Sequence, residues 1–158
     1  MTVMNKHQYK SVQLIRLIPF LLILFLLPGC KSRDPNKPAK IDNFDYTSVT
    51  NNHLSLMDFA YHLKNSGLNV VQIQPVRADV LRAADAAAIM IDNDEIGVYY
   101  YNTDVEQQRK LLEKINDDGF VYIMAFRFPV FMSGSLVITG AEKHPKKKDI
   151  VKALRSFK

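Results

Sequence analysis

The chain has 158 residues, 47% of them hydrophobic, with a single cysteine and a formal net charge of +5. This length suits one domain with a sizeable core, and one cysteine excludes an internal disulfide. Three basic and no acidic residues precede the cysteine, so the remainder carries only 18 basic against 16 acidic side chains, which argues against nucleic acid as a partner.

Residues 1–29 have the composition of a secretory signal peptide. Lys6, Lys10 and Arg16 precede an apolar run from Leu17 to Leu27, and a basic segment followed by an apolar one is typical of export signals. The run is too short for a membrane-spanning helix, which needs about 20 apolar residues. We therefore expect a cleaved signal peptide.

The apolar run ends in Leu27-Pro28-Gly29-Cys30, which holds the only cysteine. These four residues resemble the lipobox of bacterial lipoproteins. The resemblance implies cleavage before Cys30 and attachment of lipid to its thiol, so that the domain is anchored outside the cytoplasm at the cell membrane or the outer membrane. Lys31, in place of an aspartate, resembles the outer-membrane sorting pattern of organisms with two membranes.

Residues 30–52 predict a lipidated N-terminus followed by a flexible tether. The segment has two prolines, many polar side chains and no sustained apolar period before Leu54, which is the composition of a solvated linker. It is interrupted by Ile41, Phe44 and Tyr46. The sequence leaves open whether they pack on the domain or stay loose.

A single globular domain is expected over residues 53–158, and its first element is a helix. Ser55 and Asp58 have the spacing of a capping box, and Gly67 is suited to ending the helix. Between them, four apolar residues recur at the spacing of one helical face. They are Leu56, Phe59, Ala60 and Leu63.

Residues 69–74 alternate in polarity as a half-buried strand does, which places Val71 and Ile73 on one side. The next segment, residues 77–85, is rich in Ala, Leu and Arg and is interpreted either as a short helix or as a loop. In the helix alternative, the buried residues are Val80 and Leu81.

A hairpin is predicted over residues 86–101. If Asn93 and Asp94 form a two-residue turn, Ile91 faces Ile96 and one face of both strands is apolar in alternation. The sequence thus predicts both the strand pairing and the buried face.

A second capping-box pattern, Thr103 with Glu106, predicts a helix that ends near Gly119. Apolar side chains recur along this segment at helical spacing, and charged ones occupy the opposite positions. The apolar stripe consists of Val105, Leu111, Leu112 and Ile115.

Residues 120–131 are aromatic and β-prone and predict one strand, which Pro129 confines to a sheet edge or a bulge. A tight turn at residues 133–134 leads to a last strand over residues 135–139. Pro145 then begins a terminal helix. Hairpins separated by helices predict the α+β class, with an antiparallel sheet of about five strands and helices packed on one face.

No motif predicts a catalytic, cofactor-binding or metal-binding site. Three histidines follow the cysteine, at positions 53, 62 and 144, and none has a partner at metal-ligand or catalytic-triad spacing. Asp58 and His62 are four residues apart, a spacing more typical of a solvated helix pair than of a catalytic dyad.

Two groups of side chains are candidates for contact with other molecules. Four aromatic residues form a binding face if the sheet leaves one side open, or otherwise fill the core: Tyr99, Tyr101, Tyr122 and Phe128. Three lysines occupy the first turn of the terminal helix, where the helix dipole disfavours cations: Lys146, Lys147 and Lys148. They either contact membrane headgroups or form a solvated surface.

Two functional classes follow. In the first, the chain is an envelope binding or assembly module that reaches the membrane through lipid on Cys30 and meets an envelope protein partner. In the second, it is a small envelope enzyme whose site is assembled only in the fold, because catalytic residues need not be close in sequence. The missing motifs favour the first class.

Overall fold

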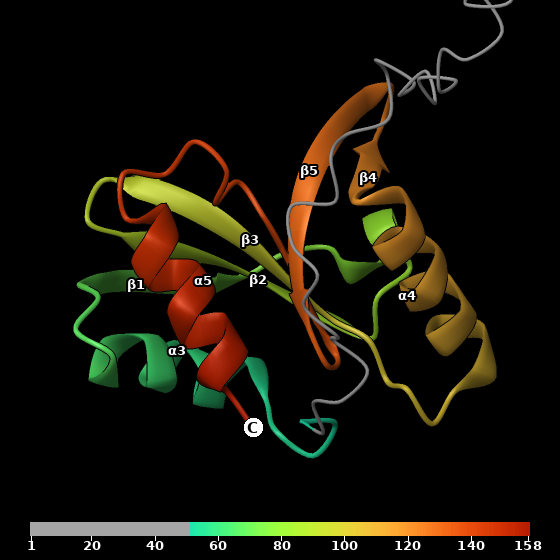
Figure 1. The fold of residues 1–158 in the computed structure, drawn as a ribbon, viewed down its shortest axis with the longest axis horizontal. Helices are drawn as coiled ribbons and strands as arrows, with labels where there is room; N and C mark the ends of the chain where they lie inside the picture. The colour runs from blue at the N-terminus through green and yellow to red at the C-terminus, as the bar shows by residue number, and fades with distance from the viewer. Residues whose placement is uncertain (1–50) are drawn as a thin grey trace, which may run out of the picture. The chain divides into compact units, whose positions relative to one another are not determined.

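A computed structural model describes residues 51–158 of the chain. They form an antiparallel sheet of six strands and three α-helices, so the predicted α+β class is confirmed (Figure 1). The elements in chain order are α3 (Leu56–Asn65), β1 (Val70–Pro75), the 3-10 helix η2 (Ala78–Leu81), β2 (Asp85–Ile91), β3 (Asp94–Tyr100), α4 (Glu106–Asp118), β4 (Phe120–Ile123), β5 (Phe126–Ser133), β6 (Leu136–Thr139) and α5 (Lys147–Ser156). The strand order is β1-β2-β3-β6-β5-β4.

The sixth strand arises because the chain turns at Met124 and Ala125. One strand was predicted over residues 120–131, whereas the structure has the hairpin β4–β5. Met124 lies at a φ of 57°, in the left-handed region. The turn contains no Gly, Pro, Asn or Asp, so the usual turn signals are missing from the sequence.

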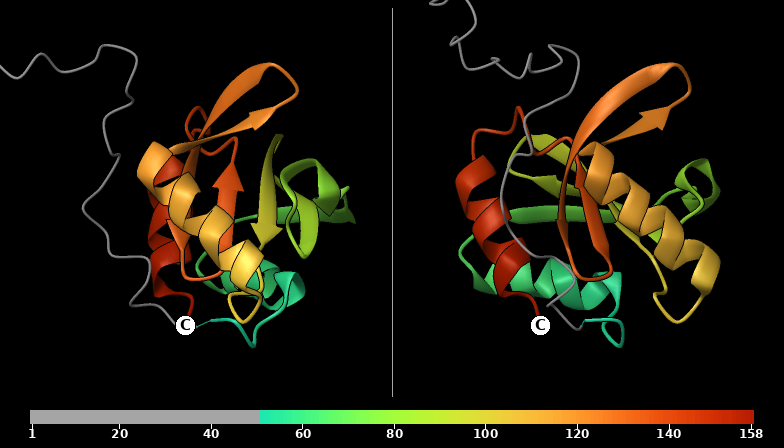
Figure 2. Two further views of the ribbon diagram at one scale, coloured as in Figure 1. Left: turned by 90° about the vertical axis from the view of Figure 1, so that its right-hand side faces the viewer. Right: turned by 45° about the vertical axis from the view of Figure 1, so that its right-hand side comes forward.

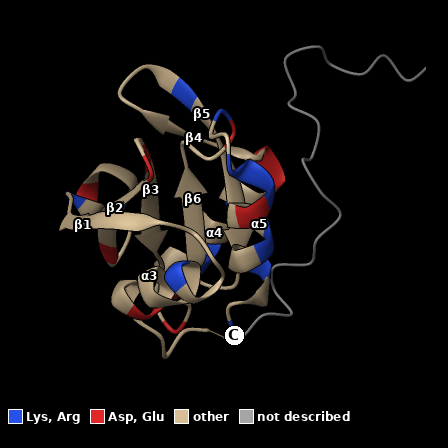
Figure 3. Ribbon diagram, turned by 90° about the vertical axis from the view of Figure 1, so that its left-hand side faces the viewer, with Lys and Arg blue, Asp and Glu red and all other residues tan. Residues whose placement is uncertain are grey.

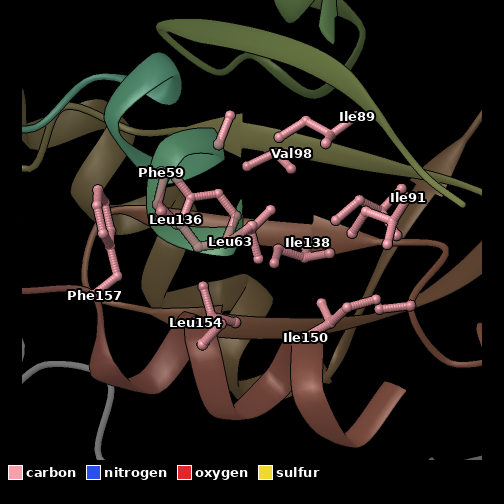
Figure 4. Packing of buried hydrophobic residues seen from close by; sticks show 14 of the residues in the cluster. Phe59, Leu63, Ile89, Ile91, Val98, Leu136, Ile138, Ile150, Leu154 and Phe157 are labelled. Atoms are coloured by element: carbon pink, nitrogen blue, oxygen red, sulfur yellow. The ribbon is translucent and has the colours of Figure 1, made fainter. Parts of the chain in front are cut away.

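Helices cover both faces of the sheet. Helices α3 and α5 pack on one face, which holds the larger core cluster shown in Figure 4. Helix α4 and η2 pack on the other face, with Leu112 and Leu81 in a second cluster. The sequence predicted that all helices pack on one face of the sheet. Helices α3 and α5 do share a face, but α4 lies on the other. Strand β3 shows why, since Val98 and Tyr99 point in opposite directions and both are buried.

The capping box of α3 is confirmed. The Ser55 Oγ accepts a hydrogen bond from the Asp58 N–H at 3.1 Å, and the Asp58 carboxylate accepts one from the Ser55 N–H at 2.9 Å. Hydrogen bonding to Ser55 also lowers the pKa of Asp58. The helix buries the predicted face, and its Phe59 ring meets Phe157 edge-on at 5.1 Å.

The β2–β3 hairpin has the predicted buried face but a different register. Its turn is formed by Asp92 and Asn93, so Ile91 pairs with Asp94, and Ile96 pairs with Ile89. The predicted pairing was therefore wrong by two residues. Because side chains alternate with a period of two, this shift leaves the same residues facing the core.

The predicted orientation of Val71 in β1 was wrong. A bulge lies between Val70 and Gln72, and an extra residue in one strand reverses the alternation that follows it. Val70 and Ile73 pack against the core, whereas Val71 is 61% exposed.

The segment after β1 contains one short turn of 3-10 helix, η2. It buries Leu81, as predicted for a helix, but leaves Val80 exposed. With three residues per turn, a 3-10 helix of this length presents few residues to the core. The segment is thus a compact connector beside β2 and β4.

The second predicted capping box was wrong. Helix α4 begins at Glu106 with Val105 as its N-cap and no side-chain cap, and Val105 is exposed. Thr103 lies two residues before this N-cap, and Glu106 is the first helical residue rather than the third, so the two residues do not form a capping box. The end of the helix is as predicted, because Gly119 adopts the left-handed conformation with a φ of 73°.

The last two residues of the tether predicted over residues 30–52, Asn51 and Asn52, are bonded to the folded domain. Asn51 is 1% exposed, and its Nδ2 donates to the carbonyl oxygens of Ser133 at 3.1 Å and Phe157 at 3.3 Å. Its Oδ1 accepts from the Ser135 N–H at 2.8 Å. Asn52 accepts from the Tyr100 hydroxyl through its backbone oxygen at 2.6 Å. Both asparagines therefore belong to the domain.

The remaining N-terminal predictions lie outside the described residues. They are the signal peptide over residues 1–29, lipid on Cys30, and the tether as far as residue 50. Within residues 51–158, no helix combines the length and the apolar character needed to cross a membrane.

Candidate functional site

The β4–β5 hairpin projects from the rest of the sheet (Figures 1 and 2). Strand β5 pairs with β4 through residues 126–129 and with β6 through residues 130–133. Pro129, which was expected at an edge or a bulge, lies where β5 passes from one partner to the other. Among the described strands, none pairs with the second edge of residues 126–129, so the missing N–H of Pro129 costs no ladder bond there.

The projecting part exposes four large apolar side chains. Met124 is 92% exposed, Phe126 69%, Tyr122 60% and Phe128 36%. In the β4–β5 pairing, Tyr122 lies opposite Arg127, and Phe128 lies opposite Val121. Paired residues share a face and neighbouring residues alternate, so Tyr122 lies on one face and Phe126 and Phe128 lie on the other. Apolar side chains therefore surround the tip of the hairpin.

The base of the hairpin is held by the core and by a small aromatic cluster. Val121 is buried in the cluster under α4, and Ile123 packs against the same cluster. On the opposite face, the Phe120 and Tyr122 rings meet edge-on at 5.2 Å, and the Arg127 guanidinium lies 5.0 Å from the Phe120 ring centroid. These contacts stabilise a two-stranded ribbon that would be marginal alone.

The four predicted aromatic residues divide between core and surface. Tyr99 and Tyr101 are buried beneath α4, so they do not form an open binding face. The Tyr101 hydroxyl donates to the Leu81 carbonyl at 3.0 Å, and burial raises its pKa. Tyr122 and Phe128 are exposed, but on opposite faces of the hairpin. The exposed surface is thus the hairpin rather than the sheet face.

The three predicted lysines have different surroundings. Helix α5 begins at Lys147, two residues later than predicted. The Lys147 ammonium forms an ion pair with Glu142 at 2.7 Å and lies 5.4 Å from the Phe131 ring centroid. Lys146 and Lys148 are exposed, and Figure 3 shows the basic residues of α5 and β5. Of the three lysines predicted to contact membrane headgroups, Lys146 and Lys148 are the exposed ones.

Two histidines connect α5 and its preceding loop to the rest of the domain. The His62 Nε2 lies 3.1 Å from the Ala153 carbonyl oxygen and 3.0 Å from the Ser156 Oγ. The His144 Nε2 lies 3.3 Å from the Ile91 carbonyl oxygen, and its Nδ1 accepts from the Lys146 N–H at 2.9 Å. Asp58 bonds Ser55 rather than His62. No group of three or more His, Cys, Asp or Glu side chains within residues 51–158 is placed to hold a metal ion.

Comparisons with protein-family models, with curated proteins and with solved structures gave no match. The geometry of the hairpin and the N-terminal motif are therefore the features that bear on function. Met124, the most exposed apolar residue of the hairpin, was not among the candidate residues predicted from the sequence.

Proposed function

We propose that the chain is a membrane-anchored bacterial lipoprotein whose domain is a binding or assembly module of the cell envelope. Lipid on Cys30 supplies the anchor, at the cell membrane or the outer membrane, and the β4–β5 hairpin supplies the contact with another envelope component. The exposed apolar tip of that hairpin carries the proposal, because a contiguous exposed apolar patch is typical of an interaction site.

The lysines that open α5 belong to the same proposal. Lys146 and Lys148 are exposed, and lysines near an anionic membrane surface add about 1 kcal/mol each to its affinity. Lys147 contributes less because Glu142 already neutralises it. The enzyme alternative has no comparable observation in its favour, since His62 and His144 form structural hydrogen bonds.

The anchor is tested by labelling. Cells fed radiolabelled fatty acid are expected to label the wild-type chain and not the Cys30→Ala variant, which should also leave the membrane fraction. Each buried methylene of an acyl chain contributes about 0.8 kcal/mol, so two or more chains give a stable attachment. Equal labelling of both chains would refute the lipoprotein assignment.

The hairpin is tested by photo-crosslinking in native membranes. A photoreactive amino acid at position 124 is expected to give a reproducible adduct, whereas the same group at position 71 gives none. Val71 is a matched control because it is also apolar and exposed, but it lies on β1 at the other edge of the sheet. Equal adduct yields at the two positions, or none at either, would remove the hairpin from the proposed function.

A further inference from the structure

We infer that the tip of the β4–β5 hairpin inserts into the headgroup region of the phospholipid bilayer to which the chain is anchored. This inference rests on the proposed function, because it names what the same hairpin contacts. Three observations support it: the distribution of apolar side chains around the tip, the distance by which the tip extends beyond β6, and the charge of the segment.

The apolar side chains lie on both faces of the hairpin and in its turn. Tyr122 and Phe126 lie on opposite faces, and Met124 occupies the turn between the strands. A folded protein that docks on one face of a two-stranded ribbon leaves the opposite face in water. A bilayer is fluid and surrounds an inserted tip on all sides, so it buries all three side chains together.

The distance by which the tip extends beyond β6 is sufficient for insertion into the membrane interface. Residues 126–129 extend beyond the end of β6, and four strand residues at about 3.4 Å each rise about 14 Å. Segments that lie in the membrane interface bury their apolar side chains about 5–10 Å deep. Deeper insertion is disfavoured because no described strand pairs with the outer edge of β4 or with one edge of residues 126–129, and hydrocarbon does not satisfy unpaired backbone groups.

The charge of the segment complements an anionic surface. From Gly119 to Ala141 the sequence contains no acidic residue, and its single charged side chain is Arg127. Arg127 lies opposite Tyr122 near the tip, and tyrosine and arginine are both suited to the headgroup level. The exposed Lys146 and Lys148 at the start of α5 add further positive charge.

The tether is long enough for the anchor and the hairpin to reach one bilayer. Asn51 is bonded to Ser133 and Ser135 at the opposite end of β5 from the tip. The eight residues of β5 span about 27 Å at 3.4 Å each. Residues 31–50 reach at most about 70 Å when extended.

The test uses tryptophan fluorescence of the full chain reconstituted in vesicles. The chain has no tryptophan, so Met124→Trp introduces the only one, at a position whose exposure leaves the core untouched. Val71→Trp is the matched control on β1. In vesicles containing anionic lipid brominated near the headgroup, we expect the Met124→Trp emission to shift to shorter wavelength and to be quenched several-fold more than that of Val71→Trp.

Each other outcome overturns the inference. Equal quenching of the two variants, or no quenching of either, contradicts insertion of the tip. A shift of the Met124→Trp emission that depends on protein concentration, without quenching, assigns the hairpin to contact between two copies. If quenching is absent but the photoreactive group at position 124 captures an envelope protein, the proposed function stands and the bilayer contact fails.

Discussion

Replacing Ile91 by alanine is expected to destabilise the domain by about 2–5 kcal/mol, the cost of losing a buried aliphatic side chain and leaving a cavity. Ile91 has no exposed surface and lies in the cluster formed by the sheet with α3 and α5 (Figure 4). Neighbours on strands and helices surround it, so collapse around the cavity is limited. Urea unfolding of the wild type and the variant measures the difference.

Val71→Ala is the control for this experiment. Val71 lies on the neighbouring strand but is exposed because of the bulge, so its truncation should change stability by no more than about 0.5 kcal/mol. A change of that small size in Ile91→Ala would show that the predicted face is not the core. The experiment does not distinguish the predicted from the observed register, because both bury Ile91.

The Asn51→Ala variant is expected to lose about 3 kcal/mol of stability or more. The substitution leaves the Ser135 N–H and the carbonyl oxygens of Ser133 and Phe157 without their side-chain partner. A buried group left unsatisfied costs about 1–3 kcal/mol, and three are affected here. Thermal and urea unfolding should both report the loss.

Two further variants separate hydrogen bonding from a general effect of substitution. Asn51→Asp keeps an acceptor for the Ser135 N–H but loses both donated bonds, so it should remain strongly destabilised. Asn65→Ala removes an exposed asparagine and should change stability by no more than about 0.5 kcal/mol. If Asn51→Ala unfolds like Asn65→Ala, the asparagine does not hold the domain together.

Features set by neighbouring residues were predictable from the sequence. The Ser55 cap, the buried face of α3 and the Gly119 helix end each depend on a few adjacent positions. The bulge at Val70 and Gln72 was not predictable, because it is a property of how β1 pairs with β2. The predicted β2–β3 register was wrong for a related reason. The predicted and the observed registers bury the same face, so the apolar pattern does not distinguish them.

The candidate site was only partly predictable. Tyr122 and Phe128 were predicted as part of a binding face. Their exposure depends on the residue at which β6 ends, and the sequence of the hairpin does not determine that residue. Strand β6 ends at Thr139, and Gly140 follows with a φ of 82°. A Cβ on Gly140 would lie 3.0 Å from the Glu95 backbone oxygen, so both the conformation and the close approach favour glycine. The chain leaves the sheet there, so the first half of β5 has no partner on that side among the described strands.

The bond between the Asn51 side chain and the Phe157 carbonyl brings the two ends of the described domain together. A fluorescent or affinity tag added after Lys158 would therefore emerge near Asn51, at the end of β5 remote from Met124. Adjacent ends also suit circular permutation, which succeeds when termini are close and the new break lies in an exposed turn. In such a permutant, a short linker would join Lys158 to Asn51, and the chain would begin at a new break elsewhere. Attaching the N-terminal segment at that break would move the anchor to another side of the domain and leave the hairpin in place.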